Sequence, residues 1–186
     1  GENIHWHWLS PDLLVGFSEQ GHVYGYTKDG QLALSLGLLT DQAASFYREP
    51  AFDGKWMFLS HPNGDLYAID TEAKRVAWSY KWKHRLLSDT FLIKDEIFVV
   101  GEVKRTEKDK KKPTSQVKLL KWSRKNGEYL GSSDGLDTKE PAKFSFSMEN
   151  QILFLASKEK LIAIQLPEMT VSWRKVLSSQ IIGPPV

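Results

Sequence analysis

The segment LYAIDTEAKRVAW, residues 66–78, is similar to LIAIQLPEMTVSW, residues 161–173, and the two align without a gap. Two weaker copies, VYGYTKDGQLAL from Val23 and LLKWSRKNGEYL from Leu119, complete the set. The four copies begin 43, 53 and 42 residues apart and are rich in β-branched, aromatic and aliphatic residues. A repeat of this period and content indicates tandem β-sheet units. No window of the sequence keeps the 3.6-residue period that helices would need.

Each copy reads as two short strands joined by a tight turn. The polar segments Lys28-Asp29-Gly30 and Lys125-Asn126-Gly127 interrupt the first and third copies. Asp-Gly and Asn-Gly supply the positive φ angles that hairpin turns require. Every copy is therefore predicted to form a β-hairpin.

Two further strands are predicted before each hairpin. The nearer one is expected at Leu13–Phe17, Trp56–Ser60, Ile97–Gly101 and Ile152–Ser157. The farther one is expected at Ile4–Trp8, Glu49–Phe52, Leu86–Ile93 and Ala142–Phe146. Four short strands per unit is the content of one β-propeller blade, so we predict an all-β propeller of four four-stranded antiparallel blades. A β-sandwich would not predict a repeat that keeps its register over 95 residues.

The predicted units divide the chain into one partial propeller domain over residues 1–186. Their approximate bounds are 1–48, 49–85, 86–135 and 136–177. Residues 178–186, which contain IIGPPV, are expected to begin a further blade.

The stretch from Gly64 to Trp78 resembles the repeat of PQQ-like (quinoprotein-type) propellers. In that family a turn, a strand of the LYALD type and a strand closing on Trp recur in each blade. Residues 161–173 share the pattern, with Gln165 in the place of the Asp. The first and third units depart from it, because Ser35 and Gly131 stand where Trp is expected. A WD40-like propeller therefore remains the alternative.

The resemblance implies how blades contact one another, since the repeat Trp of this family packs against the next blade. The residues expected to be structural blade anchors are Trp78, Trp173, Trp122 and Tyr67. The family's rings usually have seven or eight blades, so four blades would be about half of one. The other blades would come from further sequence or from a second copy of the chain.

Composition excludes several classes of function. The chain has 25 Lys and Arg against 23 Asp and Glu, a net charge of +2, which does not favour nucleic acid as a partner. It has no Cys, so disulfides, thiolate zinc sites and Cys nucleophiles are excluded. Its longest apolar runs, such as 152–156, are far shorter than the ~20 residues of a transmembrane helix.

Motifs for catalysis or cofactor binding are absent from the sequence. There is no G-x-S-x-G, no P-loop and no G-x-G-x-x-G. His5 and His7 would point to one face of a strand and could share a metal, but no third ligand is near except Glu2. We therefore expect no catalytic residue, no metal site and no cofactor.

One segment breaks the repeat and is the candidate contact surface. Residues 104–116, KRTEKDKKKPTSQ, carry six positive and two negative charges and no aliphatic or aromatic side chain. We expect a solvated loop between two strands, either a tolerated insertion or a contact for an acidic partner or an anionic lipid surface. Its candidate contact residues are Lys104, Arg105, Lys108, Lys110, Lys111 and Lys112.

The resulting expectation is a non-catalytic scaffold that presents a protein–protein interaction surface, with an unknown protein partner. Resemblance to the PQQ-like lipoprotein that helps to assemble outer-membrane β-barrels implies an exported or periplasmic bacterial protein. Two alternatives stay open. One is a fragment of a quinone- and Ca²⁺-dependent dehydrogenase, although the adjacent Cys pair of its alcohol-oxidising members is missing. The other is an intracellular WD40-like scaffold.

Overall fold

A computed structural model describes most of the chain. The described residues are 3–18, 20–38, 49–105, 114–136, 143–147, 151–157 and 160–178. Within these ranges the regular secondary structure is entirely β-strand, with no helix. The expected segment 178–186 lies outside the described residues apart from Ser178.

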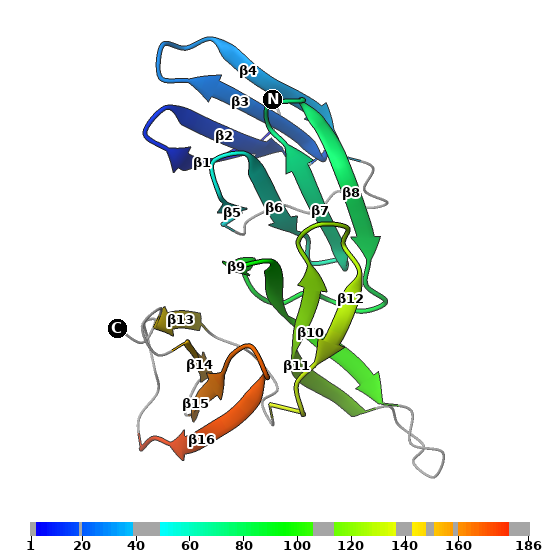
Figure 1. Cartoon of the computed structure of the whole chain (residues 1–186), viewed down its shortest axis with the longest axis vertical. Coiled ribbons are helices and arrows are strands. Elements are labelled where there is room, and N and C mark those ends of the chain that lie inside the picture. The colour runs from blue at the N-terminus through cyan, green and yellow to red at the C-terminus, as the bar shows by residue number, and fades with distance from the viewer. Residues whose placement is uncertain are drawn as a thin grey trace.

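The described strands form four antiparallel sheets, each built from four consecutive strands (Figure 1). Sheet 1 contains β1 Ile4–Ser10, β2 Leu13–Ser18, β3 His22–Thr27 and β4 Leu32–Gly37. Sheet 2 contains β5 Ala51–Phe52, β6 Trp56–Ser60, β7 Asp65–Asp70 and β8 Arg75–Lys81. Sheet 3 contains β9 Phe91–Ile93, β10 Glu96–Arg105, β11 Thr114–Ser123 and β12 Tyr129–Ser132. Sheet 4 contains β13 Lys143–Ser147, β14 Ile152–Ser157, β15 Lys160–Gln165 and β16 Thr170–Val176.

The sheets follow one another along an arc, with the first strand of each on the same side of it (Figure 1). Strands in every sheet keep their chain order, so each sheet is a simple meander. Residues of β5 and β9, the first strands of sheets 2 and 3, approach each other across the sheet boundary. This arrangement, with four antiparallel four-stranded sheets, confirms the all-β fold predicted from the repeat.

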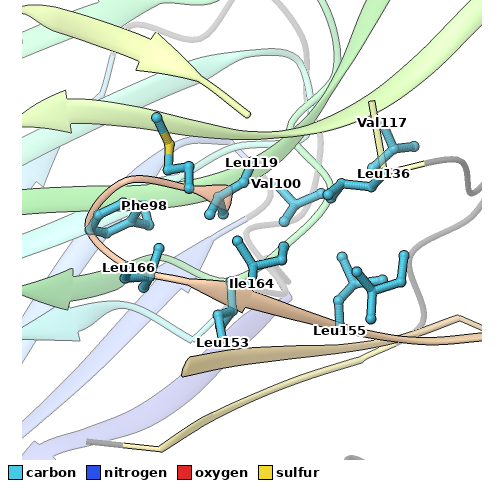
Figure 2. Close-up of a cluster of buried hydrophobic side chains, with 11 residues drawn as sticks. Phe98, Val100, Val117, Leu119, Leu136, Leu153, Leu155, Ile164 and Leu166 are labelled. Carbon is cyan, nitrogen blue, oxygen red and sulfur yellow. The ribbon is translucent and has the colours of Figure 1, made fainter. Parts of the chain in front are cut away.

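The hydrophobic core lies between consecutive sheets, because side chains on neighbouring strand positions point to opposite faces. Phe17 and Val23 of sheet 1 pack with Met57 and Ile69 of sheet 2. The opposite face of sheet 2 packs on sheet 3, and the opposite face of sheet 3 packs on sheet 4. Figure 2 shows the last of these layers, in which the cluster comprises Phe98, Val100, Val117, Leu119, Leu136, Leu153, Leu155, Ile162, Ile164, Leu166 and Met169.

Strand register identifies the positions that correspond between sheets. Ala68 pairs with Trp78 in sheet 2, and Ala163 pairs with Trp173 in sheet 4. At the same point Lys121 pairs with Gly131, as the sequence predicted. In sheet 1, however, Gly25 pairs with Leu34. Leu34, not Ser35, is therefore the counterpart of the repeat Trp, and Leu34 is buried against sheet 2.

The predicted strand Leu86–Ile93 was too long. Only β9, residues 91–93, is a strand, although Leu86 forms an isolated bridge with Gly101. The reason lies at Ser88, whose hydroxyl accepts the Val100 N–H (2.8 Å) in place of a strand carbonyl. A local side-chain acceptor of this kind competes with the ladder and interrupts it.

Candidate functional site

The hairpin of β10 and β11 is longer than any other in the described chain. Its two ten-residue strands pair continuously from Glu96 and Ser123 to Arg105 and Thr114. The prediction of a loop over the whole of residues 104–116 was therefore wrong at both ends. Each additional pair of residues satisfies its backbone groups across the ladder, so the strands can extend without burying apolar side chains.

The ends of β10 and β11 extend beyond β9 and β12 of sheet 3 (Figure 1). The backbone of Lys104 and Arg105 belongs to the end of β10. The remaining candidates, Lys108, Lys110, Lys111 and Lys112, lie outside the described residues.

Contacts from the preceding linker position the base of this hairpin. The Trp82 indole N–H donates to the Glu102 carbonyl (3.0 Å), and the Glu102 N–H donates to the Arg85 carbonyl (2.8 Å). Val103 packs against the core between sheets 2 and 3. The strand segment that precedes the basic residues in the sequence is therefore fixed to the body of the sheets.

Trp78 joins sheet 2 to the turn between β11 and β12 of sheet 3. Its indole N–H donates to the Arg124 carbonyl (3.1 Å), and its ring centroid lies 6.2 Å from that of Phe58. A Cβ atom on Gly127 would lie 2.5 Å from the Trp78 ring. The indole thus occupies the space that any side chain at Gly127 would need, and we call this arrangement the Trp–Gly contact.

An aromatic cluster lies beside the Trp–Gly contact. The fully buried Trp122 has ring neighbours Tyr80, Trp82 and Tyr129 at centroid distances of 5.8, 6.0 and 5.7 Å. Sequence reasoning named only Trp122 of these four. Trp82 lies in the linker after the repeat, so the repeat pattern carried no signal for it.

The two remaining predicted anchors differ in their surroundings. Tyr67 is buried in the core between sheets 1 and 2. Trp173 stacks near Phe154, with centroids 6.0 Å apart, but 42% of its surface is exposed. It lies on the face of sheet 4 that points away from sheet 3.

A cavity of about 520 Å³ opens between sheets 2 and 3, next to the Trp–Gly contact. Its lining residues are Trp56, Asp95, Ser123, Arg124 and Lys125. Asp53 pairs with Arg124 beside it, so this cation is already neutralised. The Lys55 ammonium lies 5.8 Å from the Trp56 ring, and its hydrogen bond to Glu72 raises the pKa of Lys55 above its ordinary value.

The His pair of β1 lies on one strand, and Glu2, the third ligand considered from the sequence, lies outside the described residues. His7 stacks near Phe17, with ring centroids 5.8 Å apart, and His5 pairs opposite Phe17 in the ladder. In the residues that the structure describes, no group of three His, Asp or Glu side chains is placed to hold a metal ion. In the same residues, no helix is long and apolar enough to cross a membrane.

Comparison with known proteins gives the fold and no closer relationship. No protein-family model and no curated protein sequence matches the chain. Among solved structures, 98% of the chain is similar to 52% of the computationally designed Ika8 protein, with 14% identity and a TM-score of 0.69. BamB from Moraxella catarrhalis matches 92% of the chain over 50% of BamB's own length, with 11% identity and a TM-score of 0.62.

A third similar structure is a europium-containing methanol dehydrogenase. It matches 92% of the chain over 41% of its own length, with 9% identity and a TM-score of 0.68. BamB and the methanol dehydrogenase are β-propellers, which supports the propeller fold for this chain. The chain spans about half the length of the structures that it matches.

Proposed function

We propose that this chain is a non-catalytic propeller scaffold whose elongated β10–β11 hairpin contacts an acidic protein partner. The observation that carries the proposal is the continuous ladder up to Arg105 and Thr114, the two strand ends that flank the basic residues 106–113 of the sequence. Binding residues are disproportionately found on segments that a rigid scaffold holds in place. A cluster of Lys side chains attracts an acidic surface and accelerates association with it.

Site-specific photo-crosslinking tests this proposal. A photoreactive residue would replace Lys111 in the basic segment. As a control, it would replace the exposed Lys74, which lies in the turn between β7 and β8 of sheet 2. We expect a defined protein adduct from position 111 and none from position 74. Changing Lys110 and Lys112 to Glu should abolish the adduct. An adduct of equal yield from both positions would contradict a role for the hairpin.

The second candidate is a fragment of a quinone-dependent dehydrogenase, which the likeness to a methanol dehydrogenase favours. Spectral titration with pyrroloquinoline quinone and Ca²⁺ distinguishes it from the scaffold. We expect no saturable binding. Saturable binding that requires Ca²⁺ would reject the non-catalytic assignment.

We also propose that the protein acts outside the cytoplasm, as the resemblance to the PQQ-like lipoprotein implies. Fractionation of the source cells would test this. Recovery in the cytoplasmic fraction alone would favour the WD40-like scaffold instead.

A further inference from the structure

The turns between the third and fourth strands of the four sheets share one backbone hydrogen bond. We call them the outer turns. In each, the first turn residue donates its N–H to a carbonyl between the first two strands of its sheet. The donors are Lys28, Thr71, Arg124 and Leu166, and the respective acceptors are Asp12, Lys55, Asp95 and Gln151. The outer turns of sheets 2, 3 and 4 have equal length, whereas that of sheet 1 is one residue shorter.

Every outer turn also has one residue with positive φ, but its identity alternates. This position holds Gly30 (φ +78°) in sheet 1, two residues after the donor Lys28, and Gly127 (φ +70°) in sheet 3, three residues after the donor Arg124. Lys74 (φ 52°) and Met169 (φ 60°) occupy it in sheets 2 and 4. Only sheets 1 and 3 thus offer an outer turn without a side chain at this point.

The repeat Trp alternates in the opposite sense. Sheets 2 and 4 have Trp78 and Trp173, whereas sheets 1 and 3 have Leu34 and Gly131. The chain is therefore a tandem of two similar two-sheet units, each with its glycine turn in the first sheet and its Trp in the second. The Trp–Gly contact between sheets 2 and 3 joins the two units.

The two ends of this tandem carry the two unpaired halves of the same contact. Phe154 and Trp173 of sheet 4 repeat the arrangement of Phe58 and Trp78, but Trp173 is exposed. At the opposite end, a Cβ atom on Gly30 would meet nothing within 4 Å.

The free face of sheet 1 is also apolar. Trp6 is 45% exposed and Trp8 is 62% exposed, and both project from β1 on the side away from sheet 2. Leu32 is 55% exposed. It holds the register position of Tyr129, which contributes to the covered face of sheet 3. Large exposed apolar side chains that lie together mark an interaction surface.

We propose that a second copy of this chain covers both free faces and closes a ring of eight sheets. In this dimer the Trp173 indole of each copy packs on the Gly30 turn of the other, and its N–H donates to the Lys28 carbonyl. The two contacts are related by a twofold axis, so each copy gives and receives one of them. This assembly does not depend on the proposed role of the hairpin.

A second copy is the occupant that the geometry favours. Its Gly30 turn provides a packing surface for Trp173 of the first copy, and its Trp173 can pack on the Gly30 turn of the first copy. The chain matches 50% of BamB, which is a β-propeller, so a ring of that size has room for one more chain of equal length.

Sedimentation of the chain and two variants tests the proposal. We expect the unmodified chain, which has a mass of 21.3 kDa, to sediment as a dimer of two chains. Trp173→Ala removes the indole, and Gly30→Asn places a side chain where the indole must pack. Asn tolerates positive φ, so the turn can keep its shape. Each variant should raise the dissociation constant by roughly tenfold or more, the scale for loss of an aromatic anchor.

The matched control is Gly54→Asn. Gly54 also has positive φ (+99°) and open space around its Cβ position, but it lies between β5 and β6, away from the free faces. This variant should dimerise as the unmodified chain does, and all variants should keep its circular dichroism spectrum.

Mixing the two interface variants separates this contact from general hydrophobic association. The Trp173→Ala chain retains Gly30, and the Gly30→Asn chain retains Trp173, so a mixed dimer has one intact contact. We expect the mixture to associate more tightly than either variant alone. A monomeric unmodified chain, an open polymer, or a mixture no tighter than its components would overturn the proposal.

Discussion

At the scale of single residues, Gly127 is constrained in two ways. Its φ is positive, and the Trp78 ring fills the space beside it. Gly30 has the same backbone conformation without the neighbouring ring. The pair therefore separates the strain of the turn from the steric demand of the contact.

We expect Gly127→Ala to destabilise the chain by more than Gly30→Ala. Both substitutions place a Cβ at positive φ, which costs about 1–2 kcal/mol. Only the first also displaces the Trp78 ring. Urea unfolding under monomeric conditions measures the free energy of unfolding of both variants. Equal decreases in this free energy would show that the Trp78 ring moves aside without cost.

Trp78 and Trp173 form a second matched pair, with the same residue type, strand position and Phe neighbour. We expect Trp78→Ala to lower the free energy of unfolding by ~3–5 kcal/mol, the range for a large aromatic in a packed site. In monomeric chains Trp173→Ala should lower it by less than ~1 kcal/mol, since the side chain is exposed. A loss from Trp78→Ala as small as that expected for Trp173→Ala would mean that Trp78 is not an anchor.

The sequence predicted those contacts that the repeat itself encodes. Trp78 and Trp173 were found because their spacing to the LYAID-like strands is constant. Leu34 was missed by one position, because the turn between β3 and β4 is one residue shorter than that between β7 and β8, and strict counting from the strand therefore reached Ser35. Trp82 was missed because it is not part of the repeat, and only its hydrogen bond to the Glu102 carbonyl reveals its role.

At the scale of elements, the β10–β11 hairpin shows what composition cannot tell. Lys104 to Gln116 has no residue that needs burial, so its sequence resembles a loop. The ladder nevertheless continues to Arg105 and Thr114, because paired backbone groups alone suffice to extend a hairpin already begun in the core. The sequence therefore located the insertion correctly but not the point at which the strands end.

Replacing residues 106–113 by Asn-Gly should leave the stability of the chain almost unchanged. Arg105 and Thr114 face each other in the ladder, so a two-residue turn can join them directly. We expect the melting temperature to change by less than roughly 3 °C, or about 1 kcal/mol. Deleting residues 102–117 instead should be much more harmful, because Val103 and Val117 pack in the cores. A large loss from the short replacement would show that the segment is packed.

At the scale of the whole molecule, no sheet has a core of its own. Each buried cluster combines residues of two consecutive sheets, so unfolding one sheet exposes the faces of its neighbours. Coupling of this kind makes stability depend on the interfaces between repeats.

We therefore expect the chain to unfold in one transition. Phe58→Ala weakens the layer between sheets 2 and 3, and Leu119→Ala weakens that between sheets 3 and 4. Each should lower the midpoint of the same transition, with a loss of ~2–5 kcal/mol. Circular dichroism and Trp fluorescence should report coincident curves. Separate curves for the two probes would show that neighbouring sheets unfold independently.

The alternation of glycine and non-glycine outer turns restricts how many blades a complete ring can contain. With an odd total, two blades of the same kind would become neighbours somewhere around the circle. Either one indole would then lack a glycine turn, or one glycine turn would lack an indole. A propeller assembled from these units is therefore expected to have an even number of blades, which favours eight over seven.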